Sequence, residues 1–347
     1  MTRIFRPTVF AIAVLSATFL SIANAGEDSL KPTEDDKKWL ISTPPPFPAD
    51  NEPTAARIEL GKQLFFDPRL SGDGNMSCAT CHNPMQGWSD GLPTGRGSKS
   101  MKLGRATPTV INTAYNFIQM WDGRKKNLED QAMGPIESAN EMNMNVEAMF
   151  EFLNQNEEYK AAFANAYPDQ AIDYKTFGKA IASYERTLVS NNSPFDRWLK
   201  GDEKAMTEQQ IRGFRLFSDQ SKSNCTACHQ APNFTDNGFH NVGLASYADA
   251  EPDMGRFKIK PIKSLRGAFK TPTLRDIALT APYFHDGSAK SLMDVMRHYA
   301  KGGEVKDDLS PDIKALDLSE QEMEDIVAFM KALTTTKTPV VLPNLPL

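Results

Sequence analysis

The chain has 347 residues, of which 40% are hydrophobic and 24% are charged, a balance that excludes a disordered or fibrous protein and allows two ordinary domains. It carries 39 Lys and Arg against 44 Asp and Glu, for a net charge of −5, and no basic block stands out as a footprint for a phosphate backbone. Nucleic acid is therefore not an expected partner.

Residues 1–25 differ from the rest of the chain. Arg3 and Arg6 precede an apolar run from about Val9 to Ile22, and Ala23-Asn24-Ala25 follows it. This order is typical of a secretory signal peptide that is cleaved after an A-x-A site. An uncleaved anchor is the alternative, although the run is short for a membrane span. We expect an exported, periplasmic protein with no membrane span after cleavage.

The elements that follow are helical. A Pro-rich N-terminal extension covers residues 26–54, and a second extended tail covers residues 337–347. Apolar periodicity predicts helices at 55–66, 125–133, 145–166, 174–190, 207–217 and 290–301. A further helix begins at the capping box of Ser319 and Glu322. No segment alternates as a strand does, which predicts an all-α protein.

Two C-x-x-C-H motifs carry the chemistry of the sequence. They are Cys78-Ala79-Thr80-Cys81-His82 and Cys225-Thr226-Ala227-Cys228-His229. This spacing attaches a c-type haem: two thiols bond the vinyl groups, and the following His ligates the iron. A zinc site, a thioredoxin-like redox pair and two disulfides are the alternatives. The redox pair needs a βαβ context that is absent, and the alternatives do not explain a His after both pairs.

Each motif is preceded by a similar segment. Leu60 to Asp67 precedes the first motif and Arg212 to Asp219 precedes the second, with Gly, Leu, Phe and Asp in register. The repeat predicts two copies of one haem-binding unit. We place them at residues 55–200 and 201–336.

The sequence contains few candidate distal ligands for the haem irons. Beyond the two motif His, the chain contains His240, His285 and His298. None lies between residues 83 and 228, so the first haem has no local distal His. Met85 and Met101 are its only soft substitutes, and both are more typical of packing or surface positions. We expect His240 and His285 to be hydrogen-bond partners near the second haem and His298 to be solvated.

A series of further segments occurs in a familiar order. It comprises Thr107-Pro108-Thr109-Val110, Trp121-Asp122-Gly123-Arg124, Gln131, Gly134-Pro135, Glu141-Met142-Asn143, Thr187-Leu188-Val189-Ser190, Thr271-Pro272-Thr273-Leu274-Arg275 and Thr280-Ala281-Pro282-Tyr283-Phe284-His285-Asp286-Gly287. With the two motifs, the series resembles the bacterial dihaem cytochrome c peroxidase family, and within it the MauG-like branch. The resemblance implies two class I cytochrome c-like domains, each with one covalently bound c-type haem. The N-terminal haem would be peroxidatic, and the C-terminal haem would relay electrons.

The resemblance also implies the sixth ligands. Members that need reductive activation carry a removable distal His at the position of Ser98, and its absence implies a first haem ready to meet peroxide while ferric. At the second haem, Tyr299 matches the Tyr ligand of MauG-like enzymes, a hard anionic donor that stabilises oxidised iron. Met296 is the rival ligand. The alternative role for Tyr299 is a buried side chain bonded to a haem propionate.

Four residues match the family's catalytic positions. Glu141 would be the acid/base that moves a proton between the peroxide oxygens, with Gln131 and Pro135 lining the same distal pocket. Trp121 resembles the tryptophan between the two haems, whose indole can pass an oxidising equivalent. Without the resemblance, Glu141 is more typical of a surface acid and Trp121 of a core aromatic.

The family further holds a calcium ion between its domains. Backbone carbonyls at Thr280 and Pro282 match two of its ligands, and calcium prefers oxygen donors. Ala106 stands where relatives often have Asn, which puts a side-chain ligand in doubt. Asn112 is a weak substitute.

The expected function is a periplasmic dihaem oxidoreductase that uses hydrogen peroxide to form high-valent haem iron. In the MauG-like form it would oxidise a partner protein, with Trp side chains as candidate targets, through the inter-haem Trp121. The alternative is a cytochrome c peroxidase that draws electrons from a small cytochrome or cupredoxin. An alternative of another class is a non-catalytic dihaem electron carrier.

Overall fold

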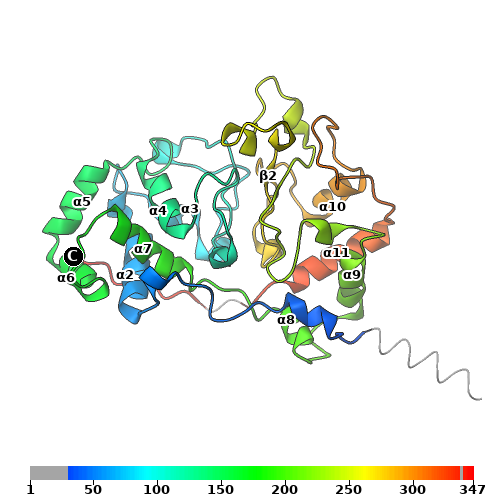
Figure 1. The fold of residues 1–347 in the computed structure, drawn as a ribbon, viewed down its shortest axis with the longest axis horizontal. Helices are drawn as coiled ribbons and strands as arrows, with labels where there is room; N and C mark the ends of the chain where they lie inside the picture. Colours follow the sequence, from blue (N-terminus) through cyan, green and yellow to red (C-terminus); the bar gives the residue numbers. More distant parts are fainter. Residues whose placement is uncertain (1–29, 337–338) are drawn as a thin grey trace, which may run out of the picture.

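The computed structural model describes residues 30–336 and 339–347, so the signal peptide expected at residues 1–25 lies outside the described chain. Two helical lobes lie side by side (Figure 1). The first lobe contains α2 (Ala55–Phe66), α3 (Cys78–Cys81), α4 (Leu128–Glu137), α5 (Val146–Gln155), α6 (Glu157–Ala166) and α7 (Tyr174–Glu185). The second lobe contains α8 (Pro194–Leu199), α9 (Glu208–Ser218), α10 (Leu292–Ala300) and α11 (Glu320–Ala332).

Short elements fill the rest of both lobes. The 3-10 helices are Asp35–Trp39, Ala49–Asn51, Pro68–Leu70, Pro84–Gln86, Ser98–Ser100, Thr113–Tyr115, Cys225–Ala227, Ala245–Ala248, Arg256–Lys258, Lys263–Leu265 and Ile277–Leu279. One antiparallel ribbon pairs β1 (Phe239–His240) with β2 (Phe269–Lys270), in the register Phe239 to Lys270 and His240 to Phe269. The all-α class is confirmed, with this two-stranded ribbon as a local addition. Within the described residues, no helix is long and apolar enough to cross a membrane.

The repeated segment before each motif forms the same helix crossing in both lobes. Gly61 of α2 lies so close to α7 that an added Cβ would meet the carbonyl oxygen of Ala180 at 1.9 Å. Gly213 of α9 lies equally close to α11, where a Cβ would meet the carbonyl oxygen of Asp325 at 1.8 Å. In each lobe the helix before the motif therefore crosses the last helix of that lobe at a glycine, because only glycine permits this backbone approach.

Three helices differ from their expected bounds. The helix expected at 174–190 ends at Glu185, because the chain turns at Arg186 and Thr187 and is not helical from residue 188. The helix expected at 145–166 is two helices, α5 and α6, because Asn156 has an extended backbone and its side chain accepts a hydrogen bond from the Tyr159 amide at 2.9 Å. Asn156 thereby ends one helix and caps the next. The helix expected at 125–133 begins at Leu128, after the Asn127 cap, and continues through Pro135 to Glu137.

Each terminal segment contacts both lobes. Trp39 lies in the core of the second lobe, stacked on Phe234 with ring centroids 4.5 Å apart, whereas Asn51 is buried in the first lobe. At the other end the chain leaves α11 and returns to the first lobe, where Arg69 donates to the carbonyl of Pro346 at 2.6 Å (Figure 1). The two termini therefore act as straps between the lobes.

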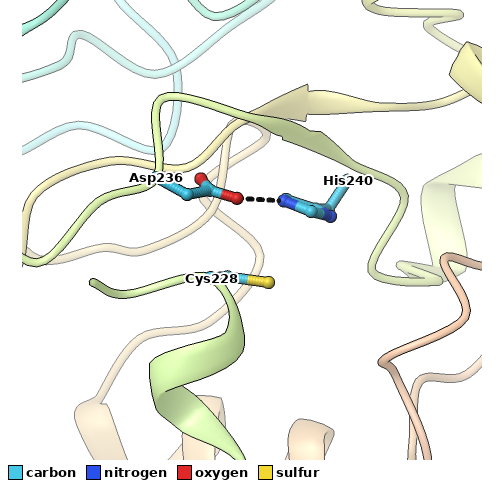
Figure 2. Close-up of side chains that lie close together, drawn as sticks. All are labelled: Cys228, Asp236 and His240. Atoms are coloured by element: carbon cyan, nitrogen blue, oxygen red, sulfur yellow. Dashed lines mark hydrogen bonds and ion pairs between the residues drawn. The ribbon is translucent and has the colours of Figure 1, made fainter.

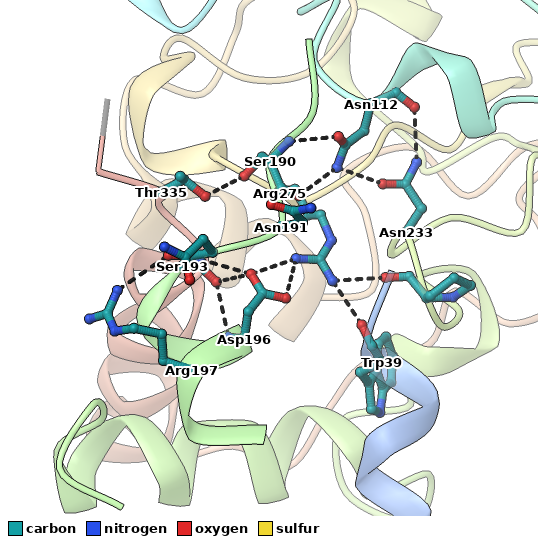
Figure 3. Close-up of polar contacts among 12 residues, drawn as sticks. Trp39, Asn112, Ser190, Asn191, Ser193, Asp196, Arg197, Asn233, Arg275 and Thr335 are labelled. Carbon is teal, nitrogen blue, oxygen red and sulfur yellow. Dashed lines mark hydrogen bonds and ion pairs between the residues drawn. The ribbon is translucent and has the colours of Figure 1, made fainter. Parts of the chain in front are cut away.

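A buried polar network lies where the lobes meet (Figure 3). Arg275 and Asp196 are fully buried and form an ion pair at 2.8 Å, and the same guanidinium donates to the carbonyls of Trp39 and Pro232. Its α8 partner lies N-terminal to the boundary expected at residue 200, and α8 packs in the core of the second lobe. The network fixes α8 and the N-terminal strap against the second lobe.

Candidate functional site

A cavity of about 480 Å³ in the first lobe is lined by the first motif. Cys78, Cys81 and His82 form one side of it. The Nδ1 atom of His82 lies 3.2 Å from the carbonyl oxygen of Trp88, and burial lowers the pKa of this imidazole. A neutral His that donates from Nδ1 to a carbonyl presents Nε2 as a ligand atom, as proximal haem ligands do.

The catalytic candidates line the same cavity. Gln131 and Pro135 lie one turn apart on α4, and Glu141 follows in the turn after α4. Burial raises the pKa of Glu141, which favours its holding a proton. The amide of Ser98 donates to the carbonyl of Glu141 at 2.7 Å, and the Ser98 hydroxyl donates to Asp73. The structure thus brings Glu141, Gln131 and Pro135 together in one pocket with the first motif.

The two Met suggested as soft ligands for the first haem are on the surface. Met85 is 77% exposed and Met101 is 48% exposed, and neither lines the cavity. Three thioethers that the sequence reasoning missed do line it: Met76, Met120 and Met142. Met142 directly follows Glu141, so adjacency to a catalytic candidate was the only available signal.

A second buried acid in this cavity was also missed. Glu185, at the end of α7, lines the cavity one turn after Ile181 and is almost fully buried. Its Oε2 atom has no hydrogen-bond partner among the described residues, and burial raises its pKa to about 8. The signal in the sequence was an acid on the apolar face of a helix.

The second motif lines a cavity of about 270 Å³ in the second lobe. Cys225, Cys228 and His229 face it, and Nδ1 of His229 lies 2.9 Å from the carbonyl oxygen of Phe234. Burial lowers the pKa of His229, so this imidazole has the same arrangement as His82. The two motifs therefore form matching donor sets.

Both candidate sixth ligands face this second cavity. Tyr299 and Met296 lie three residues apart on α10, and both line the cavity. Burial raises the pKa of Tyr299 well above its ordinary value, so the phenol needs a cationic centre to ionise. Position alone does not separate the two residues.

The three remaining His lie in the second lobe. His285 lines the second cavity and stacks on Phe269 with ring centroids 3.5 Å apart. His240 also lines it and hydrogen-bonds Asp236 at 2.8 Å. His298, expected to be solvated, is buried instead, because its ring packs on Phe284 and its Nε2 bonds the carbonyl of Val242 at 2.8 Å.

Three potential metal-ligating side chains lie close together in the second lobe. Figure 2 shows Cys228, Asp236 and His240, whose potential ligand atoms lie within 4.8 Å of one another. Cys225 and His229 are not part of this cluster, so the C-x-x-C-H residues do not converge as zinc ligands would. No disulfide joins any of the four cysteines, all of which fall in the described chain.

One wall separates the two cavities. Residues 106–109 and 119–121 line both, and Trp121 is among them. The indole N–H of Trp121 donates to the carbonyl of Ala106 at 2.9 Å, while its own carbonyl accepts from the Lys270 amide at 2.8 Å. Trp121 is thus held by both lobes.

The residues considered for calcium lie at different places in the structure. Thr280 and Pro282 line the second cavity. Asn112, considered a weak substitute ligand, has its amide engaged elsewhere: its oxygen accepts from the Ser190 amide at 2.8 Å, and its nitrogen donates to Ser190 and Asn233 (Figure 3). Asn112 joins the lobes through hydrogen bonds.

Two family models match successive parts of the chain. A family model described as di-haem cytochrome c peroxidase matches residues 55–204, and one described as cytochrome c matches residues 210–334. The methylamine utilization protein MauG of Methylophilus methylotrophus is 41% identical over 340 residues, which cover 97% of this chain and 99% of the relative. This chain belongs to the di-haem cytochrome c peroxidase family. It is accordingly an oxidoreductase of the di-haem peroxidase type.

Two further proteins of this kind are also similar to the chain. The cytochrome c551 peroxidase of Pseudomonas aeruginosa is 39% identical over 83% of this chain and 81% of its own. The crystal structure of a MauG-like protein associated with microbial copper homeostasis matches with a TM-score of 0.78 and 31% identity, over 85% of this chain and 95% of that one. The family implies haem in both lobes, and the two donor sets of paired thiols and an oriented imidazole fit it.

Proposed function

We propose that the protein is exported to the periplasm, consumes hydrogen peroxide at the haem of the first lobe and oxidises a partner protein by way of Trp121 and the second haem. In this reaction peroxide takes up two electrons and two protons and leaves as two water molecules. The electrons come from the partner, with Trp side chains as the candidate targets. The position of Trp121 supports this proposal, because this residue lines both cavities.

The chain's own residues divide the work. Haem, when bound, supplies the iron that reacts with peroxide. Glu141 takes the proton from one peroxide oxygen and returns it to the leaving oxygen, a role that its half-buried position and raised pKa support. Gln131 and Pro135 shape the pocket around the peroxide. His82 and His229 would be the proximal ligands, and Tyr299 would be the sixth ligand of the second haem.

A second candidate function uses the same machinery. The protein would then be a cytochrome c peroxidase that takes electrons from a small cytochrome or cupredoxin, as the 39% identical peroxidase from Pseudomonas aeruginosa suggests. Ser98 and Tyr299 favour the MauG-like form. The non-catalytic electron carrier has no support, because the chain belongs to a peroxidase family.

A calcium ion belongs to this proposal as well. The carbonyl oxygens of Thr280 and Pro282, beside the second cavity, would be two of its ligands. Ala106 offers no side-chain oxygen.

One experiment tests the proposal directly. Stoichiometric hydrogen peroxide is added to the fully ferric holoprotein, and both haems are followed by optical and EPR spectroscopy. We expect both to change at once, without prior reduction. A protein that reacts only after one haem is reduced would have a hidden distal ligand and would be a reductively activated peroxidase.

A further inference from the structure

A basic and apolar surface segment projects above the junction of the lobes, in the olive to yellow part of the chain at the top of Figure 1. Residues 254–270 contain no Asp or Glu, although the whole chain has a net charge of −5. We call residues 256–266 the basic loop. Its basic side chains are Arg256, Lys258, Lys260, Lys263 and Arg266, and apolar residues separate them. This interleaving explains why no basic block stands out in the sequence.

The tip of the basic loop is exposed. Residues 258–264 are all exposed, and Ile259 and Ile262 keep 46% and 45% of their surface accessible. Among the described residues, Lys260 and Lys263 form no ion pair, whereas Lys258 lies 3.5 Å from Asp253. Two cations without an ion pair thus alternate along the tip with two exposed aliphatic side chains. Apolar residues at the centre with charges around them are typical of protein-binding surfaces.

The residues at the base of the basic loop hydrogen-bond the wall between the cavities. Arg256 donates to the carbonyls of Asp122 and Gly123, at 2.9 and 2.6 Å, directly after Trp121. Four residues beyond the other end of the loop, the Lys270 amide donates to the carbonyl of Trp121. Lys258 itself lines the first cavity. A protein bound to this loop would therefore lie beside the residue that joins the two cavities.

We propose that the basic loop is the docking surface for the redox partner, and that this partner presents acidic side chains around an apolar centre. The inference rests on the proposed function and adds the chemistry of the partner's surface. A chain of net negative charge repels an acidic protein over most of its surface, so a local positive patch both steers the partner and fixes where it binds. A basic partner would be repelled at this loop.

The test uses the holoprotein and one probe in two charge states. Horse cytochrome c is basic, and succinylation of its lysines makes it acidic while its haem stays covalently attached. Peroxide-dependent oxidation of each reduced form is measured against salt concentration. We expect the acidic form to be oxidised with the higher kcat/KM, and this advantage to fall as salt rises.

The variant Lys260→Glu/Lys263→Glu reverses two exposed, unpaired charges. It should lower kcat/KM for the acidic probe about tenfold or more, mainly through KM, and leave the reaction with peroxide alone unchanged. The matched control is Lys175→Glu/Lys204→Glu, which changes the net charge equally at exposed sites away from both cavities. Ile262→Ser should weaken binding while its salt dependence stays.

Binding is also measured without turnover, by NMR line broadening of the ferric acidic probe. Broadening that the loop variant loses supports docking even if no form reacts with peroxide, a result that would refute only the proposed function. Equal broadening with the loop variant and the control would overturn the docking site. So would tighter binding of double-stranded DNA than of the acidic probe, which would make the loop a nucleic-acid site.

Discussion

The indole nitrogen of Trp121 donates a hydrogen bond to the carbonyl oxygen of Ala106, and both residues line both cavities. Ala106 in turn donates its amide to the carbonyl of His285 at 2.7 Å, so the wall is tied to the second lobe. His285 lies edge-on to Trp121, with ring centroids 6.4 Å apart. An indole held in this way keeps one orientation between the two cavities.

Trp121→Phe should slow the transfer of an oxidising equivalent from the first haem to the second. Phenylalanine keeps an aromatic ring but loses the hydrogen bond and the oxidisable indole, so the first haem should still react with peroxide while the second haem changes state much more slowly. Rapid-mixing absorption spectroscopy resolves the two events. Trp88→Phe, in the first core, is the control. Equal effects of the two substitutions would remove Trp121 from the path.

Glu141→Gln should slow the reaction with peroxide. The amide keeps the shape of the side chain but cannot take up and return a proton, a function that contributes roughly 10²- to 10⁴-fold in rate. Stopped-flow mixing of the ferric protein with peroxide measures the rate constant, and the resting spectra of both haems should stay unchanged. A wild-type rate would mean that the base lies elsewhere, with Glu185 as the next residue to test.

Tyr299→Phe and Met296→Leu together identify the sixth ligand of the second haem. Only the substitution that removes the ligand should change the absorption and EPR spectra of that haem, because both side chains face the same cavity. We expect the change with Tyr299→Phe. If the spectrum changes only with Met296→Leu, the ligand is the thioether and Tyr299 is a buried side chain.

Glu185 should make the stability of the protein depend on pH. Burial raises the pKa of this carboxyl from 4.5 to about 8. Between these values the unfolded chain has lost the proton that the folded chain keeps, so the unfolding free energy falls as pH rises, by up to about 1.4 kcal/mol per pH unit. Glu185→Gln cannot ionise and should exceed the wild type in stability, by more at pH 8 than at pH 5.

Denaturant unfolding at the two pH values measures this difference. Glu324→Gln, at an exposed position of α11, is the control and should not alter the pH dependence. A pH profile that Glu185→Gln leaves unchanged would show that the carboxyl has a partner in the holoprotein.

The buried ion pair of Arg275 and Asp196 should be costly to break. Asp196→Asn leaves a fully buried guanidinium without its counter-charge, and such changes cost about 3–5 kcal/mol. Arg297→Gln removes an exposed pair with Glu320 and should cost no more than about 1 kcal/mol. Thermal unfolding of both variants compares them, and similar losses would mean that the buried pair stabilises α8 no more than an exposed pair would.

Local chemistry in this protein was readable from the sequence. The motif of Cys78 to His82 places its three groups on one turn, so spacing alone indicates the haem. The repeat that contains Gly61 and Gly213 marks two equivalent helix crossings, because a close backbone approach demands glycine wherever it occurs. The helical class followed from apolar periodicity for the same reason: each depends only on residues near one another in the chain.

The tertiary structure alone decided which distant residues share a space. Trp121 lies in a wall between two cavities because segments from both lobes bond to it, and no local pattern records those bonds. Glu185 became a cavity residue only when α7 packed beside the first motif. The terminal straps and the burial of His298 have the same origin. Sequence spacing encodes contacts within a turn or a helix, whereas contacts between lobes depend on how the whole chain packs.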